Sequence, residues 1–203
     1  AFYRAADAAG PVNRGHLDMH TAIRGSLYRQ FALLPAHAAD FSPDFYQLLQ
    51  ASGMDAVVRH TEAAGTFTHF TCEKCAAQSA TLELGKVMPF GANDLSLFAA
   101  ADAAIRAWIA DAPLPPRDKA PVDYFLVEEI IIKREGEFTL NLAADVENFT
   151  ALPAGYEIAR QAEKRWVAQA RAPYILFPNA GVATGQRAGL LLRAAALRLP
   201  QPA

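Results

Sequence analysis

The chain has 203 residues, of which 52% are hydrophobic and 20% are charged, with a formal net charge of −2. That is enough apolar material for one or two packed domains, and it excludes disorder over most of the length. No basic run or stripe indicates a nucleic-acid partner. No apolar run reaches the roughly 18–20 residues that a membrane-spanning helix needs, so we expect no membrane partner. The two cysteines fit a reducing compartment, such as the cytoplasm.

Helix and strand patterns alternate in the first half of the chain. An alanine-rich segment predicts a helix over residues 1–9, and Ser42-Pro43 is typical of a helix start. Further helices are expected over 68–78 and from Asn93 or Asp94 through 110, the last with Leu95, Phe98, Ile105 and Ile109 on one apolar stripe. Strands are expected at 16–20, 28–34, 55–60 and 79–84. This alternation predicts an α/β layer with a mostly parallel sheet.

The composition changes after residue 112. Residues 113–121 hold four prolines and several charges, which is typical of a linker. Beyond them the period of the apolar pattern is two. Strands are expected at 124–133, 137–142, 156–160, 165–169, 174–177 and 190–193. We therefore predict an α/β part over 1–112 and a small all-β sandwich or barrel over 122–203.

One glutamate stands out. Glu83 lies between Leu82 and Leu84 on an apolar strand that we expect to break at Gly85. Burying a carboxylate without a partner costs roughly several kcal/mol. Deprotonating a metal-activated water would be a reason to place it there. The alternative, on the residues alone, is a core glutamate paired with lysine or arginine.

Four motifs follow one another in the first half of the chain, namely HLDMHTAIRGS at 16–26, GTFTHF at 65–70, TLELGK at 81–86 and PFGANDL at 89–95. In this order they resemble the succinylglutamate desuccinylase/aspartoacylase family of zinc carboxypeptidase-like hydrolases. ADVENFTALP at 144–153 and ILFPN at 175–179 resemble the C-terminal β-domain of that family. The resemblance implies a zinc-carboxypeptidase-like mixed sheet with flanking helices, followed by a small all-β domain.

The resemblance also implies roles for particular residues. His20 takes the place of the third ligand of a single zinc ion, and Glu83 that of the general base. Arg24 is a candidate for binding a substrate carboxylate, with Thr21 and His69 as further substrate-binding candidates. On the residues alone, a surface arginine, a turn-capping threonine and a helix-capping histidine explain these three equally well. Asp18 either orients a zinc ligand or simply ends a strand.

One departure from the family concerns the metal. The family carries a His-x-x-Glu zinc motif near its N-terminus, and none of the five histidines here is followed three residues later by glutamate. Two of the three expected zinc ligands are therefore missing from this sequence. We expect these residues to be the C-terminal part of a longer enzyme, with weak or no activity by themselves.

The resemblance predicts a cytoplasmic zinc-dependent amide hydrolase. Its substrate would be a small molecule, N2-succinyl-L-glutamate, which it would cleave to succinate and L-glutamate in arginine catabolism. Residues 21–25, Thr-Ala-Ile-Arg-Gly, favour this over an aspartoacylase-like deacylase of another N-acyl amino acid. An inactive fragment that lacks the zinc motif is the remaining alternative. The sequence does not predict an oligomeric state.

Overall fold

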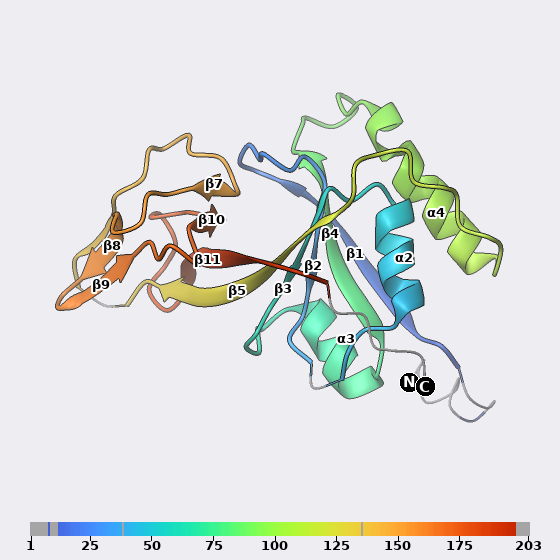
Figure 1. Ribbon diagram of the computed structural model, residues 1–203, viewed down its shortest axis with the longest axis horizontal. Helices are drawn as coiled ribbons and strands as arrows, with labels where there is room; N and C mark the ends of the chain where they lie inside the picture. The colour runs from blue at the N-terminus through green and yellow to red at the C-terminus, as the bar shows by residue number, and fades with distance from the viewer. Residues whose placement is uncertain (1–7, 9–11, 38, 135, 198–203) are drawn as a thin grey trace.

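A long mixed sheet organises the molecule (Figure 1). The computed structural model describes residues 8, 12–37, 39–134 and 136–197, so the helix expected over 1–9 lies outside the described residues apart from Ala8. The strands are β1 (Gly15–Ala22), β2 (Phe31–Leu34), β3 (Ala56–Arg59), β4 (Gln78–Lys86), β5 (Asp123–Ile132), β6 (Phe138–Leu140), β7 (Thr150–Ala151), β8 (Glu157–Gln161), β9 (Lys164–Val167), β10 (Tyr174–Leu176) and β11 (Arg187–Ala195). The helices are α2 (Pro43–Ala51), α3 (Phe67–Cys75), η1 (Leu95–Phe98) and α4 (Ala99–Ile109).

The main sheet has eight strands in the order β1-β4-β2-β3-β5-β11-β10-β7. Three neighbouring pairs are parallel, namely β1 with β4, β2 with β3, and β3 with β5. The other four pairs are antiparallel. Among the first four strands, two of the three neighbouring pairs are parallel, as the helix–strand alternation predicted, and the antiparallel pair of β4 with β2 is the exception. The sheet as a whole is mixed because the later strands, which are joined without helical crossovers, add three antiparallel pairs.

The later strands divide between two sheets. β5, β7, β10 and β11 extend the main sheet, and β6, β8 and β9 form a separate three-stranded sheet. In Figure 1 the strand β5 runs out of the helix-flanked part toward β8 and β9. Ile131, Ile175 and Leu191 from the main sheet pack against Ile158 and Trp166 of the small one. The predicted fold class, a mixed sheet with flanking helices followed by a small β unit, is confirmed.

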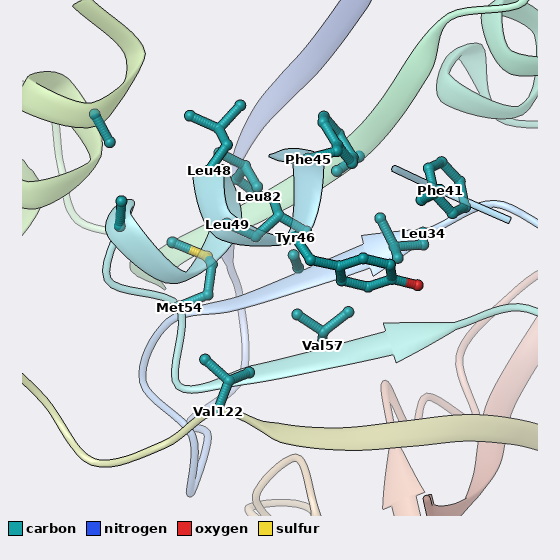
Figure 2. Packing of buried hydrophobic residues seen from close by; sticks show 14 of the residues in the cluster. Leu34, Phe41, Phe45, Tyr46, Leu48, Leu49, Met54, Val57, Leu82 and Val122 are labelled. Atoms are coloured by element: carbon teal, nitrogen blue, oxygen red, sulfur yellow. The ribbon is translucent and has the colours of Figure 1, made fainter. Parts of the chain in front are cut away.

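The main core lies between α2 and one face of the sheet (Figure 2). The Ser42 hydroxyl accepts a hydrogen bond from the Phe45 amide and caps α2, whose first residue is Pro43, as the sequence predicted. The helix turns an apolar face onto the sheet, where Leu48 and Leu49 are fully buried. Their partners include Leu34, Val57 and Leu82.

The helix expected from Asn93 or Asp94 through residue 110 begins differently. Asp94 caps the short 3₁₀ turn η1, and α4 starts only at Ala99. Leu95 and Ile109 are 74% and 77% exposed, so the predicted stripe is wrong at both ends, while Phe98 and Ile105 pack against the core. The 3₁₀ turn takes Leu95 out of the α-helical phase, and Ile109 is the last residue of α4. The buried positions of α4 are the small Ala101 and Ala104, which let the helix approach the core closely.

Most other elements lie where the pattern placed them, with shifted ends. α3 stops at Cys75 rather than continuing to residue 78, because Ala76 adopts a left-handed conformation (φ 49) and β4 begins at Gln78. β2 is confined to its last four predicted residues, and the two-residue strand β7 was not predicted. Within the described residues no helix combines the length and apolarity that a bilayer crossing requires.

Candidate active site

The strand β4 presents different chemistry on its two faces. Leu82 and Leu84 belong to the core beneath α2. Thr81 and Glu83 alternate with them and therefore point to the opposite face. Glu83 is in register with His20 on the parallel neighbour β1, so both side chains lie on this second face. Two motifs far apart in sequence thus bring the predicted base and the predicted metal ligand together.

A bulge in β4 follows directly after Glu83. The pair His20–Glu83 is followed by the pair Ala22–Lys86, so β4 carries one more residue than β1 between them. Gly85 lies in this bulge with φ 133, a conformation that side-chain-bearing residues rarely adopt. The strand continues to Lys86. The expectation that it breaks at Gly85 was therefore wrong, because the glycine accommodates an extra residue instead.

Two cavities meet at this position. One has a volume of ≈ 290 Å³ and lies toward β2 and the start of α3. The other has a volume of ≈ 540 Å³ and lies along residues 20–24 and the segment after β10. Four residues line both cavities: His20, Glu83, Phe177 and Arg187. These four side chains therefore mark the junction of a two-lobed site.

The Glu83 carboxyl group is chemically unusual. The residue is only 7% exposed, and its Oε2 has no hydrogen-bond partner among the described residues. Burial raises the pKa of Glu83 above its ordinary value, while His20 and Arg187 nearby oppose that rise and Asp18 adds to it. A carboxyl group with a raised pKa and a free oxygen at a cavity junction is suited to accept and return a proton.

His20 fits one position of a metal site. Its Nε2 lies 3.1 Å from Oδ1 of Asp18, and its side chain is half exposed. If the neutral ring donates from Nε2 to this carboxylate, Nδ1 keeps the lone pair that a metal requires. Within the described part of the chain, no group of three or more His, Cys, Asp or Glu side chains could hold a metal ion. The described residues thus fit one ligand and do not complete a coordination sphere.

The other predicted substrate-binding residues lie at different distances from the junction. Thr21 and Arg24 line the larger cavity. The Arg24 Nη1 donates hydrogen bonds to the carbonyl oxygens of Ala144 and Val146, the second at 3.2 Å. His69 lines a third cavity of ≈ 520 Å³ instead, and its amide donates to the Thr66 hydroxyl that caps α3. The structure therefore groups Thr21 and Arg24 with His20 and Glu83 and sets His69 apart.

Three residues of the site were missed by sequence reasoning. His60 follows β3, is 7% exposed and forms a wall of both the ≈ 290 Å³ cavity and the cavity of His69. Phe177 follows β10, and Arg187 begins β11. No local pattern marks Arg187, because only the pairing of β11 with β5 and the curvature of the sheet bring it to Glu83. Phe177 lies in the family-like segment 175–179, which was the available signal.

Comparison with known proteins agrees with the motif pattern. Residues 3–109 match the family model described as the succinylglutamate desuccinylase/aspartoacylase catalytic domain, and residues 120–195 match the AstE/AspA barrel-sandwich hybrid domain. Succinylglutamate desuccinylase of Photorhabdus laumondii is 49% identical over 179 residues, which cover 88% of this chain and 55% of that protein. The corresponding protein of Serratia proteamaculans is 45% identical with the same coverage.

Solved structures of similar proteins share the fold. The crystal structure of succinylglutamate desuccinylase from Vibrio cholerae has a TM-score of 0.87 at 32% identity, covering 98% of this chain and 59% of that one. The structure from Chromobacterium violaceum has a TM-score of 0.76 at 37% identity, covering 97% of this chain and 59% of that one. The chain thus spans about half the length of the curated relatives it matches. It belongs to the succinylglutamate desuccinylase/aspartoacylase family.

Proposed function

We propose that this chain forms part of a hydrolase that cleaves N2-succinyl-L-glutamate to succinate and L-glutamate in arginine catabolism. The proposal draws on the relatives named succinylglutamate desuccinylase, and above all on one observation. The buried Glu83 carboxyl group, with an unpartnered oxygen, lies at the junction of two cavities. A substrate with a central amide and an acid chain on each side fits such a two-lobed site.

Glu83 is the general base and then the general acid of the proposed reaction. It accepts a proton from a water molecule as the water oxygen bonds to the amide carbonyl carbon. It then donates that proton to the amide nitrogen as the carbon–nitrogen bond breaks. The bond cleavage leaves the new carboxylic acid group of succinate and the amine of glutamate, and the remaining water proton passes from the acid to the amine to give the carboxylate and the ammonium group. The raised pKa of Glu83 supports both steps, because it makes the carboxylate a stronger base and keeps the proton available.

We propose zinc as the cofactor, with His20 as one ligand and Asp18 fixing the orientation of its ring. The described residues do not complete a group of three possible ligands, so the proposal requires further ligands from outside them. When bound, zinc would polarise the scissile carbonyl and acidify the attacking water. The 3.1 Å contact between His20 and Asp18 supports this assignment, because a carboxylate partner is typical of metal-binding histidines.

Thr21, Arg24 and His69 are proposed substrate-binding residues. Thr21 and Arg24 line the ≈ 540 Å³ cavity, where the remaining guanidinium nitrogens of Arg24 could meet a carboxylate. His69 requires a substrate that extends past His60, which is the wall common to the two neighbouring cavities.

We also propose that residues 113–121 divide the catalytic part from the β-rich part. A cytoplasmic location is supported by Cys72 and Cys75, which are both free thiols.

The test is succinate release from N2-succinylglutamate. Because the chain spans about half of its relatives, the assay uses the complete gene product, loaded with zinc. The variant Glu83→Gln keeps the size and polarity of the side chain but cannot carry the proton. We expect a loss of roughly 10²- to 10⁴-fold in kcat. The matched control is Glu163→Gln, an exposed glutamate in the turn between β8 and β9, which should retain full activity.

Two results would contradict the proposal. One is equal activity of the Glu83→Gln variant and the parent enzyme. The other is a parent enzyme that is folded and zinc-loaded yet prefers N-acetylaspartate, which would assign the chain to the aspartoacylase side of the family.

A further inference from the structure

A row of contacts connects Glu83 to Arg187. Glu83 is in register with Phe31 on the antiparallel neighbour β2. The ring of Phe31 lies 5.8 Å from the ring of Phe177, centroid to centroid. The Arg187 Cζ in turn lies 5.3 Å from the centroid of the Phe177 ring. The first residue of β11, from the β-rich part, therefore lies against the junction where Glu83 acts.

The support beneath Arg187 is rigid. Phe177 has a positive φ of 52, which places its ring out of line with β10. The Phe177 amide donates a hydrogen bond of 2.8 Å to Oδ1 of Asn148. Asn148 is fully buried, and its own amide and carbonyl are bonded to the backbone of Gly25 and Leu27. The aromatic platform is thus fixed to the loop that follows β1.

Among the described residues, the Arg187 guanidinium has no anionic partner and forms no hydrogen bond. Its side chain contacts the Phe177 ring. The guanidinium and the Glu83 carboxylate influence each other electrostatically, yet they do not approach within ion-pair distance. A positive charge with free donors beside a two-lobed cavity is suited to bind an anionic group.

We propose that Arg187 binds the α-carboxylate of the N-acylglutamate substrate. This inference rests on the proposed function. Arg187 lines both cavities, so it lies at their junction, beside the position that the proposed function gives to the scissile amide. Of the three carboxylates of succinylglutamate, the α-carboxylate is the nearest to that amide, since it is attached to the carbon bonded to the amide nitrogen. The other two are separated from the amide by flexible methylene chains and belong deeper in the two lobes.

Arg24 is less suited to this role. Its Nη1 is engaged by two backbone carbonyls of the segment 144–146, and it lines only the larger cavity. We assign Arg24 to the connection between β1 and the β-rich part, with at most a distal carboxylate as its ligand. Arg187 and Arg24 therefore make different predictions about which substrate group each one recognises.

The test pairs arginine variants with substrates that lack one carboxylate each. Arg187→Gln removes the charge, and Arg187→Lys keeps the charge but loses the fork of donors. The substrates are N2-succinylglutamate, N-succinyl-4-aminobutyrate without the α-carboxylate, N-succinylnorvaline without the γ-carboxylate, and N-butyrylglutamate without the succinyl carboxylate. The control Arg165→Gln changes an exposed arginine of β9 that is paired with Glu157.

With N2-succinylglutamate we expect Arg187→Gln to lower kcat/KM by about 10- to 100-fold, with Arg187→Lys intermediate. With N-succinyl-4-aminobutyrate the same substitution should change kcat/KM by less than about 3-fold, since the bond is already missing. The other two substrates should retain the full effect. An undiminished effect on N-succinyl-4-aminobutyrate, or an effect abolished by removing a different carboxylate, would overturn the assignment.

A binding measurement separates this inference from the proposed function. In the Glu83→Gln background, calorimetry compares the affinity of N2-succinylglutamate with and without Arg187→Gln. If the two affinities are equal, and the parent enzyme with Glu83 hydrolyses the substrate, the role of Arg187 is refuted and the proposed function remains intact. If binding depends on Arg187 but the parent enzyme with Glu83 shows no hydrolysis, the proposed function is refuted and the binding role of Arg187 is supported. Absence of binding to the zinc-loaded, folded enzyme refutes both.

Discussion

The two faces of the sheet around β4 differ in the hydrogen bonding of their buried side chains. Beneath α2, Leu82 and Leu84 are 0% and 8% exposed, and their neighbours are apolar. On the opposite face, Glu83 and His60 are nearly as buried, but each has a polar atom without a partner among the described residues. One strand therefore contributes packing on one face and unsatisfied polar chemistry on the other. Substitutions on the two faces should separate folding stability from activity.

The largest effect on stability is expected at Leu82. Leu82→Ala removes a fully buried side chain and should lower the free energy of unfolding by about 3 kcal/mol. Glu83→Gln, one residue away, should leave that free energy unchanged or raise it at neutral pH. Burial raises the pKa of Glu83, so its ionised form opposes folding above that pKa, and the amide carries no such cost. Urea unfolding of both variants checks the contrast.

The comparison between the faces fails if Glu83→Gln is as destabilising as Leu82→Ala. In that case the carboxylate would be a packing element of the core. Loss of hydrolysis in the glutamine variant could then be explained by unfolding rather than by the missing base.

The polar face should also make stability depend on pH through His60. Burial, with lesser contributions from Arg187 and His69, lowers the pKa of His60 from 6.5 to about 4. The unfolded chain therefore binds a proton more readily than the folded one. The stability from the neutral ring is fully present above pH 6.5 and is lost as the pH falls through 4.

A His60→Gln variant measures this contribution. Between pH 7 and pH 5, the parent should lose about 2 kcal/mol of unfolding free energy relative to the variant. His37→Gln, at a half-buried histidine away from Glu83, is the control and should follow the parent. Parallel pH profiles of the parent and His60→Gln would show that His60 is protonated equally in both states.

Local signals in the sequence predicted much of the packed face. Alternating apolar residues located β1 and β4, and Ser42-Pro43 located the start of α2. Strand direction was not predictable in the same way, because the insertion of β4 between β1 and β2 depends on long-range pairing. The 3₁₀ turn before α4 was missed because its residues also fit an α-helical stripe.

The polar face was predicted in part. The lone Glu83 between two leucines, and the family motif around His20, located the junction of the cavities. Arg187 carried no such signal. Its place in the site requires β11 to pair with β5 and Phe177 to leave the line of β10, and neither can be read from neighbouring residues. Asn148 was family-like without an evident role until its contacts with Phe177 and Gly25 were known.

Substitution of Asn148 should have a smaller effect on stability than Leu82→Ala, together with an effect on substrate binding. Asn148→Ala leaves the partly buried Phe177 amide without an acceptor and should cost about 1 to 2 kcal/mol. It should also raise KM, because the ring beneath Arg187 is no longer fixed. Asn141→Ala is the control: it loses hydrogen bonds to Glu157 near the small sheet and should lower stability with no change in KM. A normal KM for Asn148→Ala would argue against the aromatic platform.

The smallest effect is expected at the bulge. Gly85 has φ 133 and nothing within 4 Å of the position of an added Cβ, so Gly85→Ala tests backbone strain without any clash. We expect a loss of about 1 kcal/mol in unfolding free energy. Gly65→Ala also meets nothing within 4 Å and has no positive φ, so it should be neutral or slightly stabilising.

Relief of the backbone strain in Gly85→Ala would shift Glu83 relative to His20, since the bulge follows that pair directly. Gly85→Ala should therefore lower kcat more than its small stability loss suggests, and normal kcat would show that the bulge does not position the base.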